Sequence, residues 1–294
     1  MNDVPGQGAM DPGDAGLPSR QLSLANRLSG RLLRLVSKRT TSRPRDYEEA
    51  YFRRGASEAS TFLRRFSFPI DFRDKRVLDY GCGYGPLAFH LAQDEAAAAV
   101  TGVDIDEARI DFARRALASE YPDLAGSVGF KLPEEIIGQQ FDIVVSKDSF
   151  QHYADPVGVL SHMAQLTAPG GLIVIGFGPL WKSPYGGAID FITKLPWAHL
   201  LFSEEVIMQE RMRYRPEEKA QAYADIRGGF SKMTLGRFRQ IVADSNVNVL
   251  SFRANASSGA VGNASRLLAG IPGWREFFTL NVYAVLSTPN PGAE

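Results

Sequence analysis

The sequence predicts an α/β fold with a doubly wound, mostly parallel sheet. Short apolar runs alternate with helical patterns between residues 76 and 177, which is typical of βαβ units. The runs are nearly continuously apolar, as expected of strands covered by helices on both faces. Hydrophobic residues make up 44% of the 294 residues, ample for a buried core, and the length allows one large domain with an elaboration or two small domains.

Two segments precede the predicted sheet. Residues 1–19 are rich in Gly, Pro and Asp, and we expect a disordered tail there. Residues 20–45 contain eight basic residues and no acidic ones. Helical spacing places apolar residues on one face and basic residues beside it; the apolar set is Leu24, Leu28, Leu32, Leu35 and Val36, and the basic set is Arg27, Arg31, Arg34 and Lys38. The pattern leaves two interpretations open, a helix on an anionic membrane surface or a helix that packs its leucines on the domain.

Residues 46–294 are expected to form the main domain. Residues 46–66 predict one or two short helices, with Asp46 as a candidate N-cap. Asp155 followed by Pro156 predicts a helix start, and Gly170-Gly171 predicts a turn. The predicted strands are 76–81, 99–104, 127–132, 141–146 and 172–177, and the predicted helices are 86–93, 106–121 and 156–166.

The alternation stops near Pro179 and resumes near residue 234. Residues 179–232 contain no clear strand, are aromatic at first, and then become charged and helical in pattern over 216–229. Because this insertion follows the fifth strand, we expect it to form a lid over the substrate. A helix over 234–245 and strands over 248–253 and 277–287 follow, with a short helix at 264–270 between the two strands.

The most informative motif joins the first strand to the first helix. Gly81, Gly83 and Gly85 alternate with other residues, so the backbone can turn tightly and approach a ligand; a simple tight turn is the alternative. Asp79 ends the strand, where it would repel a pyrophosphate and attract an amine. Asp104 ends the second strand, where a carboxylate can accept both ribose hydroxyls. Ribose plus ammonium without phosphate describes S-adenosylmethionine.

Four motifs resemble those of the class I S-adenosylmethionine-dependent methyltransferases, in the group of small-molecule and ubiquinone-pathway enzymes. They are VLDYGCGYGPLAFHLA, GVDID, FDIVVSKDSFQHYADP and LTAPGGLIVIGF. The resemblance covers about residues 75–178. It implies a Rossmann-like, seven-stranded sheet in which the last two strands form a hairpin-like pair and make one edge antiparallel.

The resemblance also implies roles for individual residues. The glycines and Asp79 would line the methionine part of the cofactor, and Asp104 would bind the ribose. Lys131 stands where the family often has an acidic residue on the adenine, so adenine contact would depend on apolar packing or backbone. The cofactor residues implied are Asp79, Gly81, Gly83, Gly85, Asp104, Ile105, Leu132, Ser146 and Lys147. Tyr47, Tyr51 and Arg54 are candidates to fold over the cofactor, and ordinary packing of an N-terminal helix is the alternative.

Methyl transfer to a hydroxyl usually needs a base that removes a proton. His152 follows the fourth strand and is the first candidate, the alternative being a histidine that orders the loop or contacts the cofactor. Trp181, Tyr185 and His199 are candidates in the lid. Cys82 has no apparent activating neighbour in the sequence, and methyl transfer needs no thiol.

The resemblance predicts an enzyme that moves a methyl group to a hydroxyl of a small or lipid-linked acceptor by in-line transfer. The alternatives are a nucleic-acid or protein methyltransferase and a non-catalytic protein that binds S-adenosylmethionine. An NAD-dependent oxidoreductase is disfavoured by Asp79 and by Pro86, which replaces the last glycine of a dinucleotide fingerprint.

Composition limits the remaining possibilities. Lys and Arg total 33, as do Asp and Glu, so the balanced charge gives no reason to expect nucleic acid. The single cysteine excludes an internal disulfide framework, and no clustered ligand spacing suggests a metal. The first residues lack the pattern of a secretory signal. We therefore expect a cytoplasmic protein, with peripheral membrane contact through residues 20–45 as the open question.

Overall fold

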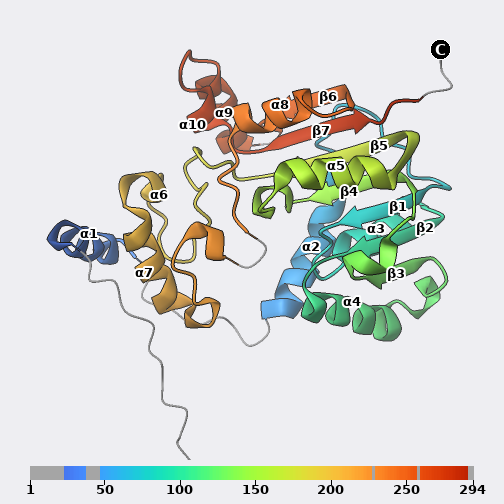
Figure 1. The fold of residues 1–294 in the computed structure, drawn as a ribbon, viewed down its shortest axis with the longest axis horizontal. Coiled ribbons are helices and arrows are strands. Elements are labelled where there is room, and N and C mark those ends of the chain that lie inside the picture. Colours follow the sequence, from blue (N-terminus) through green and yellow to red (C-terminus); the bar gives the residue numbers. More distant parts are fainter. Residues whose placement is uncertain (1–22, 38–46, 227–228, 257–258, 291–294) are drawn as a thin grey trace, which may run out of the picture.

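A computed structural model describes residues 23–37, 47–226, 229–256 and 259–290. The predicted tail at 1–19, Asp46 and Lys38 lie outside these residues. The described residues form a seven-stranded sheet with the order β3-β2-β1-β4-β5-β7-β6 (Figure 1). The strands are β1 (Arg76–Tyr80), β2 (Ala99–Val103), β3 (Val128–Lys131), β4 (Phe141–Lys147), β5 (Thr167–Phe177), β6 (Asn248–Ala254) and β7 (Val282–Ser287).

The strand order reverses between β1 and β4. From β1 the chain proceeds outward through β2 and β3, and it then returns to β4 and β5 on the other side. These five strands are parallel, whereas β7 runs antiparallel to both β5 and β6. The predicted sheet with an antiparallel pair at one edge is confirmed. In such sheets, ligands bind outside the carboxyl ends of the strands at the point of reversal.

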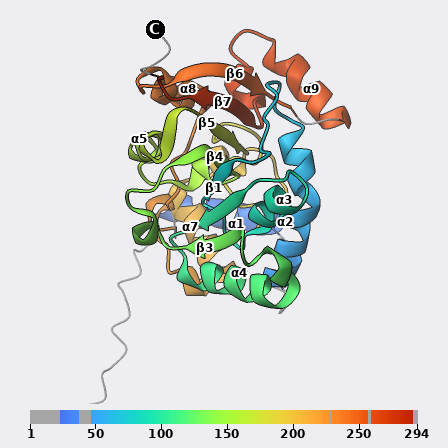
Figure 2. The same cartoon turned by 90° about the vertical axis from the view of Figure 1, so that its right-hand side faces the viewer.

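Helices cover both faces of the sheet, as the apolar strands predicted (Figure 2). Adjacent residues of one strand point to opposite faces; Val77 packs in the core cluster of α2, α3 and α4, and Leu78 packs in the cluster of α5 and α8. These helices are α2 (Tyr47–Leu63), α3 (Pro86–Gln93), α4 (Glu107–Glu120), α5 (Pro156–Leu166) and α8 (Leu235–Ala243). Residues 47–63 form a single helix, and Asp155 caps α5 by accepting from the backbone N–H of Gly158.

Three predicted bounds were wrong. The last strand begins at Val282 rather than 277, because α10 (Arg275–Phe278) occupies the preceding residues. The helix between the last two strands, α9 (Gly259–Ala269), begins earlier than residue 264. β5 begins at Thr167, so the predicted turn at Gly170 lies inside the strand. Gly170 has a φ of 73°, and the register between β4 and β5 shifts nearby, between Phe141 and Ile143.

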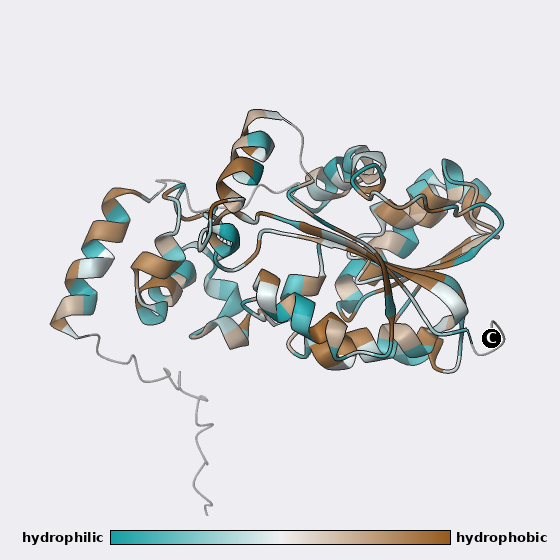
Figure 3. Cartoon of the chain, turned by 90° about the horizontal axis from the view of Figure 1, so that it is seen from above, coloured by the Kyte–Doolittle hydropathy of each residue, from teal (hydrophilic) through white to brown (hydrophobic). Residues whose placement is uncertain are grey.

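The insertion at 179–232 packs beside the sheet and carries α1 (Leu24–Leu35) on its outer side (Figures 1 and 3). It contains α6 (Ala198–Leu201) and α7 (Glu204–Tyr214), and α1 packs against α7. The predicted helical stretch 216–229 was wrong, since its described residues form only the short 3₁₀ turns Pro216–Glu218 and Tyr223–Asp225. Pro216 ends the preceding helix because the residue before a proline is forced out of the helical conformation.

Candidate functional site

The glycine loop, residues 81–85, lies between β1 and α3 at the carboxyl ends of the strands. Its three glycines have positive φ angles of 78°, 56° and 84°, a conformation that strongly favours glycine. The backbone N–H groups of Gly81 and Cys82 donate to the carbonyl of Val103, at 2.8 and 3.0 Å. The loop is therefore tied to the end of β2, next to the point where the strand order reverses.

The glycines have different surroundings. A Cβ on Gly85 would lie 2.4 Å from Cε1 of Phe130, and one on Gly81 would lie 2.7 Å from the hydroxyl oxygen of Tyr153. A Cβ on Gly83 would meet no described atom within 4 Å. Gly81 and Gly85 thus satisfy packing within the protein, while Gly83 leaves open space where a ligand could approach the backbone.

Asp79 is the buried carboxylate of the site, with only 1% of its surface exposed. Its Oδ2 has no hydrogen-bond partner within the part of the chain that the structure describes. Burial raises the pKa of Asp79 to about 7, with Lys147 opposing the shift and Asp104 adding to it. An unpartnered buried carboxylate oxygen is costly, and a cationic ligand would relieve that cost.

Asp104 fixes the glycine loop relative to β2. Its Oδ2 accepts from the N–H of Gly83 at 2.9 Å, and its Oδ1 accepts from the N–H of Asp106 at 2.9 Å. The guanidinium of Arg109 lies 4.0 Å from the same carboxylate. Each carboxylate oxygen has two lone pairs, so both retain an acceptor position for ligand hydroxyls.

The end of β4 closes the site from the other side. Ser146 is fully buried, and Lys147 pairs with Asp148 at 2.9 Å. The hydroxyl of Ser149 donates to the carbonyl of Gly81 at 2.9 Å, and that of Tyr153 donates to the carbonyl of Tyr80 at 3.1 Å. The sequence reasoning missed these last two residues, because a hydroxyl in a loop gives no pattern that predicts a contact about 70 residues away.

The remaining predicted cofactor residues lie at the edge of the site. Ile105 is 68% exposed directly after Asp104, so its side chain is available for packing on a ligand. Leu132 is partly buried against the core, and its N–H donates to Glu135. Tyr51 of α2 lies 5.6 Å from the ring of Tyr84 in the glycine loop.

His152 joins the site to the insertion. Its ring centroid lies 5.7 Å from that of Phe230, which stacks on Tyr223 and also contacts Trp181. Burial lowers the pKa of His152 to about 4, and Arg109 contributes in the same direction. The imidazole is therefore neutral near pH 7, and a pKa this far below 7 makes it a weaker proton acceptor than an ordinary histidine.

The insertion candidates have different environments. A ring nitrogen of His199 lies 2.5 Å from the carbonyl oxygen of Trp181, so this histidine helps to hold the aromatic cluster together. Tyr185 is 45% exposed. The hydroxyl of Tyr223 is buried and has no hydrogen-bond partner among the described residues, although nothing in the sequence distinguished this tyrosine. The structure therefore brings Trp181 and His199 toward His152, with Tyr185 more exposed.

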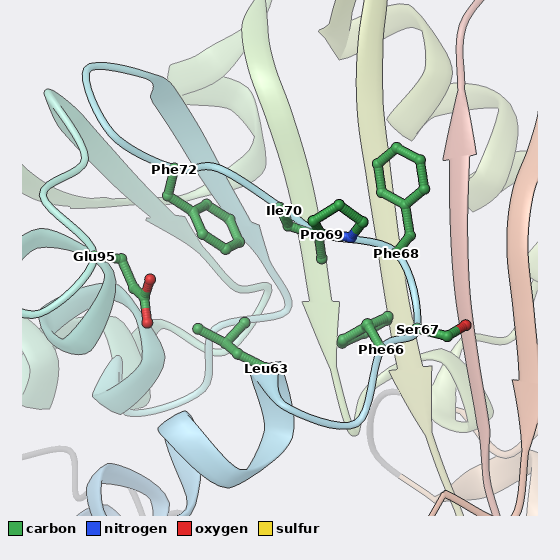
Figure 4. A pocket seen from close by; sticks show the side chains of 8 residues that line it. All are labelled: Leu63, Phe66, Ser67, Phe68, Pro69, Ile70, Phe72 and Glu95. Atoms are coloured by element: carbon green, nitrogen blue, oxygen red, sulfur yellow. The ribbon is translucent and has the colours of Figure 1, made fainter.

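Two other features lie outside this chemistry. Burial raises the pKa of the Cys82 thiol, which disfavours a thiolate nucleophile. A cavity opens under residues 66–72, lined mainly by apolar side chains with Glu95 at its edge (Figure 4). Its lining residues come from the end of α2, from the segment that leads into β1 and from Glu95. Among residues 23–37, 47–226, 229–256 and 259–290, no group of three or more His, Cys, Asp or Glu could hold a metal.

The strand order, the antiparallel β7 and the carboxylates around the glycine loop define the class I methyltransferase fold. Residues 71–177 match a family model described as a methyltransferase domain. The match overlaps the stretch whose motifs resemble the class I S-adenosylmethionine-dependent methyltransferases.

Solved structures share this fold. An S-adenosylmethionine-dependent methyltransferase from Mesorhizobium loti is 16% identical with a TM-score of 0.50, over 80% of this chain and 99% of that one. Phosphoethanolamine N-methyltransferase 2 from Haemonchus contortus, solved with S-adenosyl-L-methionine, is 16% identical with a TM-score of 0.50, over 80% of this chain and 53% of that one.

Sequence relatives match part of the chain. The ubiquinone biosynthesis O-methyltransferase of Cereibacter sphaeroides (strain ATCC 17025 / ATH 2.4.3) is 35% identical over 118 residues, which are 40% of this chain and 46% of the relative. The protein of that name from Stutzerimonas stutzeri (strain A1501) is 34% identical over 129 residues, 42% of this chain and 52% of the relative. The chain thus spans about half the length of the curated relatives it matches.

Proposed function

We propose that this protein is an S-adenosylmethionine-dependent methyltransferase that methylates a hydroxyl of a small-molecule acceptor. The observation that carries the proposal is the pair Asp79 and Asp104 around a glycine loop with open space at Gly83. The relatives' name, O-methyltransferase, supports oxygen as the acceptor atom.

The site residues suit the parts of this cofactor. The Oδ2 atom of Asp79 has no hydrogen-bond partner among the described residues. It would accept a charge-assisted hydrogen bond from the ammonium group of the cofactor. The remaining acceptor positions of Asp104 suit the ribose hydroxyls. Gly83 lets the backbone approach the methionine part, Ser146 and Lys147 offer backbone groups to its amine, and Ile105 and Leu132 offer apolar contact to the adenine. The sulfonium of the bound cofactor supplies the electrophilic methyl group.

The protein contributes alignment, exclusion of water and, for a hydroxyl, removal of a proton. We assign the proton acceptor role to Nδ1 or Nε2 of His152, because this histidine follows β4 at the site and lies beside Phe230 of the insertion. The insertion at 179–232 would act as the lid, since Trp181, Tyr223 and Phe230 place an aromatic wall beside this histidine. Such a wall suits an apolar or ring-shaped acceptor. A lipid-linked acceptor is the more specific version of this proposal.

Calorimetry with S-adenosylhomocysteine tests the cofactor assignment. We expect binding to the wild type and at least ~tenfold weaker binding to Asp104→Ala, because two buried acceptors are lost. Asp111→Ala, an exposed carboxylate on α4, is the matched control and should bind like the wild type. Equal affinities for all three proteins would remove the ribose role of Asp104, and no binding to the wild type would reject the proposed function.

A second experiment tests the acceptor atom and the base. Production of S-adenosylhomocysteine is measured with a panel of phenols and catechols and with the matching aryl amines. Turnover of only the amines would contradict O-methylation. With a phenol that is turned over, a full rate for His152→Asn would remove His152 as the base.

A further inference from the structure

Helix α1 turns a row of leucines away from the protein. Leu24, Leu28, Leu32 and Leu35, here called the leucine face, are 72%, 52%, 60% and 81% exposed. Leu33 on the opposite side is fully buried. The alternative in which these spaced leucines pack on the domain is therefore wrong. Among the leucines of α1, only Leu33 packs against the insertion. Exposed apolar stripes of this kind mark interaction surfaces.

The orientation of α1 is fixed by contacts on its inner side. Leu33 packs in the hydrophobic cluster of the insertion. Nε of Arg34 donates to Glu210 of α7 at 2.5 Å, and the hydroxyl of Thr193 donates to the carbonyl of Val36 at 2.8 Å. Because apolar, ionic and backbone contacts agree, the outward direction of the leucine face is a property of the docked helix.

The surroundings of the leucine face combine apolar and basic groups. At 100° per residue, Arg27 and Arg31 lie directly beside the leucines, and α1 contains no acidic residue. Leu200 and Leu201 of α6 are 40% and 67% exposed. They lie close in sequence to Ser203, whose hydroxyl donates to Asn26 of α1, so α6 adds exposed apolar residues in the neighbourhood of α1.

We propose that the leucine face and its flanking arginines dock this protein on an anionic bilayer surface, with α1 lying in the headgroup layer. Leucines would enter the acyl boundary while the arginines reach the lipid phosphates. Helix α1 forms the end of the molecule farthest from the sheet (Figures 1 and 3), a convex position that suits a flat partner. Its 12 residues extend about 18 Å, too short to cross a hydrocarbon core of ~30 Å. None of the described helices has the length and apolar character of a membrane span.

Docking through α1 would also turn the insertion toward the membrane. Leu33 and Phe230 belong to the same cluster, and Phe230 contacts His152. If the proposed function holds, an acceptor dissolved in the bilayer would approach the molecule from the side that α1 presents. This consequence rests on the proposed function, whereas the docking itself does not.

Vesicle co-sedimentation tests the docking. The full chain is mixed with vesicles of phosphatidylglycerol and phosphatidylcholine, or of phosphatidylcholine alone, at low and high salt. We expect binding to the anionic vesicles, weakened by salt, and at least ~tenfold weaker binding of the double variant Leu28→Glu/Leu32→Glu. Ile137→Glu changes a still more exposed apolar residue, 79% exposed, in the loop before β4, and should bind like the wild type.

Several outcomes would overturn the proposal. Equal binding to neutral vesicles would remove the role of the arginines, and equal binding of the double variant would remove the leucine face. Loss of binding in Leu267→Glu, which changes a 76% exposed residue of α9, with binding retained in the double variant, would move the surface to α9. A dimer in light scattering that the double variant abolishes, without vesicle binding, would assign the face to a second copy. Calorimetry with S-adenosylhomocysteine on the same variants separates these failures from a failure of the proposed function.

Discussion

Substitution of two glycines of the glycine loop by alanine should affect different properties, stability at Gly85 and ligand binding at Gly83. Gly85→Ala places a Cβ 2.4 Å from Cε1 and 2.6 Å from Cζ of Phe130, in a residue with φ of 84°. The left-handed conformation costs about 1–2 kcal/mol, and overpacking a core adds about 1–3 kcal/mol. We therefore expect Gly85→Ala to lower the free energy of unfolding by about 2–5 kcal/mol.

Gly83→Ala should affect ligand binding more than stability. Its φ of 56° implies the same strain of about 1–2 kcal/mol, but no described atom lies within 4 Å of the new Cβ. The methyl group would occupy the space proposed for the cofactor, so we expect at least ~tenfold weaker binding of S-adenosylhomocysteine.

Denaturation followed by tryptophan fluorescence measures stability, and calorimetry measures binding. If Gly83→Ala binds like the wild type, the loop does not hold the cofactor as proposed. If the two variants are equally stable, the packing of Phe130 against Gly85 has been overestimated.

Three further predictions concern other parts of the structure. Because burial raises the pKa of Asp79 to about 7, binding of the ammonium-bearing cofactor product at pH 7 should release roughly half a proton from this carboxyl; calorimetry in buffers of different ionisation enthalpy should show that release in the wild type and its absence in Asp79→Asn. His152 has a folded pKa of about 4, below its unfolded value of 6.5, so at this residue the unfolded state binds more protons between these values and its contribution to stability falls by about 1 kcal/mol at pH 5.5. Asp79, whose folded pKa is raised to about 7, shifts stability in the opposite direction, so the contribution of His152 is the difference between the wild type and His152→Gln in urea denaturation at pH 7 and pH 5.5; the same pH dependence in both proteins would contradict the burial argument. Leu33→Ala should loosen α1 from α7 at a cost of about 2–5 kcal/mol, seen as faster amide hydrogen exchange in both helices, whereas Leu35→Ala, at an 81% exposed position, should leave exchange in α7 unchanged.

Much of the sheet and part of the site followed from local signals. Pro86 at the first turn and the apolar period predicted helix 86–93 with the bounds that the structure has. Asp79 and Asp104 stand at the ends of the first two strands, and parallel neighbouring strands bring their carboxyl ends to one edge. In the structure β1 and β2 pair in parallel, with Asp79 opposite Gly102. Asp104 follows two residues after Gly102, so both carboxylates lie at the carboxyl ends of neighbouring strands, beside the glycine loop.

Other features depended on contacts between distant residues. The hydroxyls of Ser149 and Tyr153 reach the backbone of Gly81 and Tyr80 only after β1 and β4 pair. Periodicity in α1 identified an apolar face, but the same leucines suit either a core or a membrane surface. Only the packing of Leu33 in the insertion cluster and the bond from Arg34 to Glu210, 176 residues later, decided which face turns outward. The sequence by itself thus determined the fold and the two carboxylates, because strand ends are local features, and the tertiary structure decided the exposed leucines and the hydroxyls, because those depend on which surfaces meet.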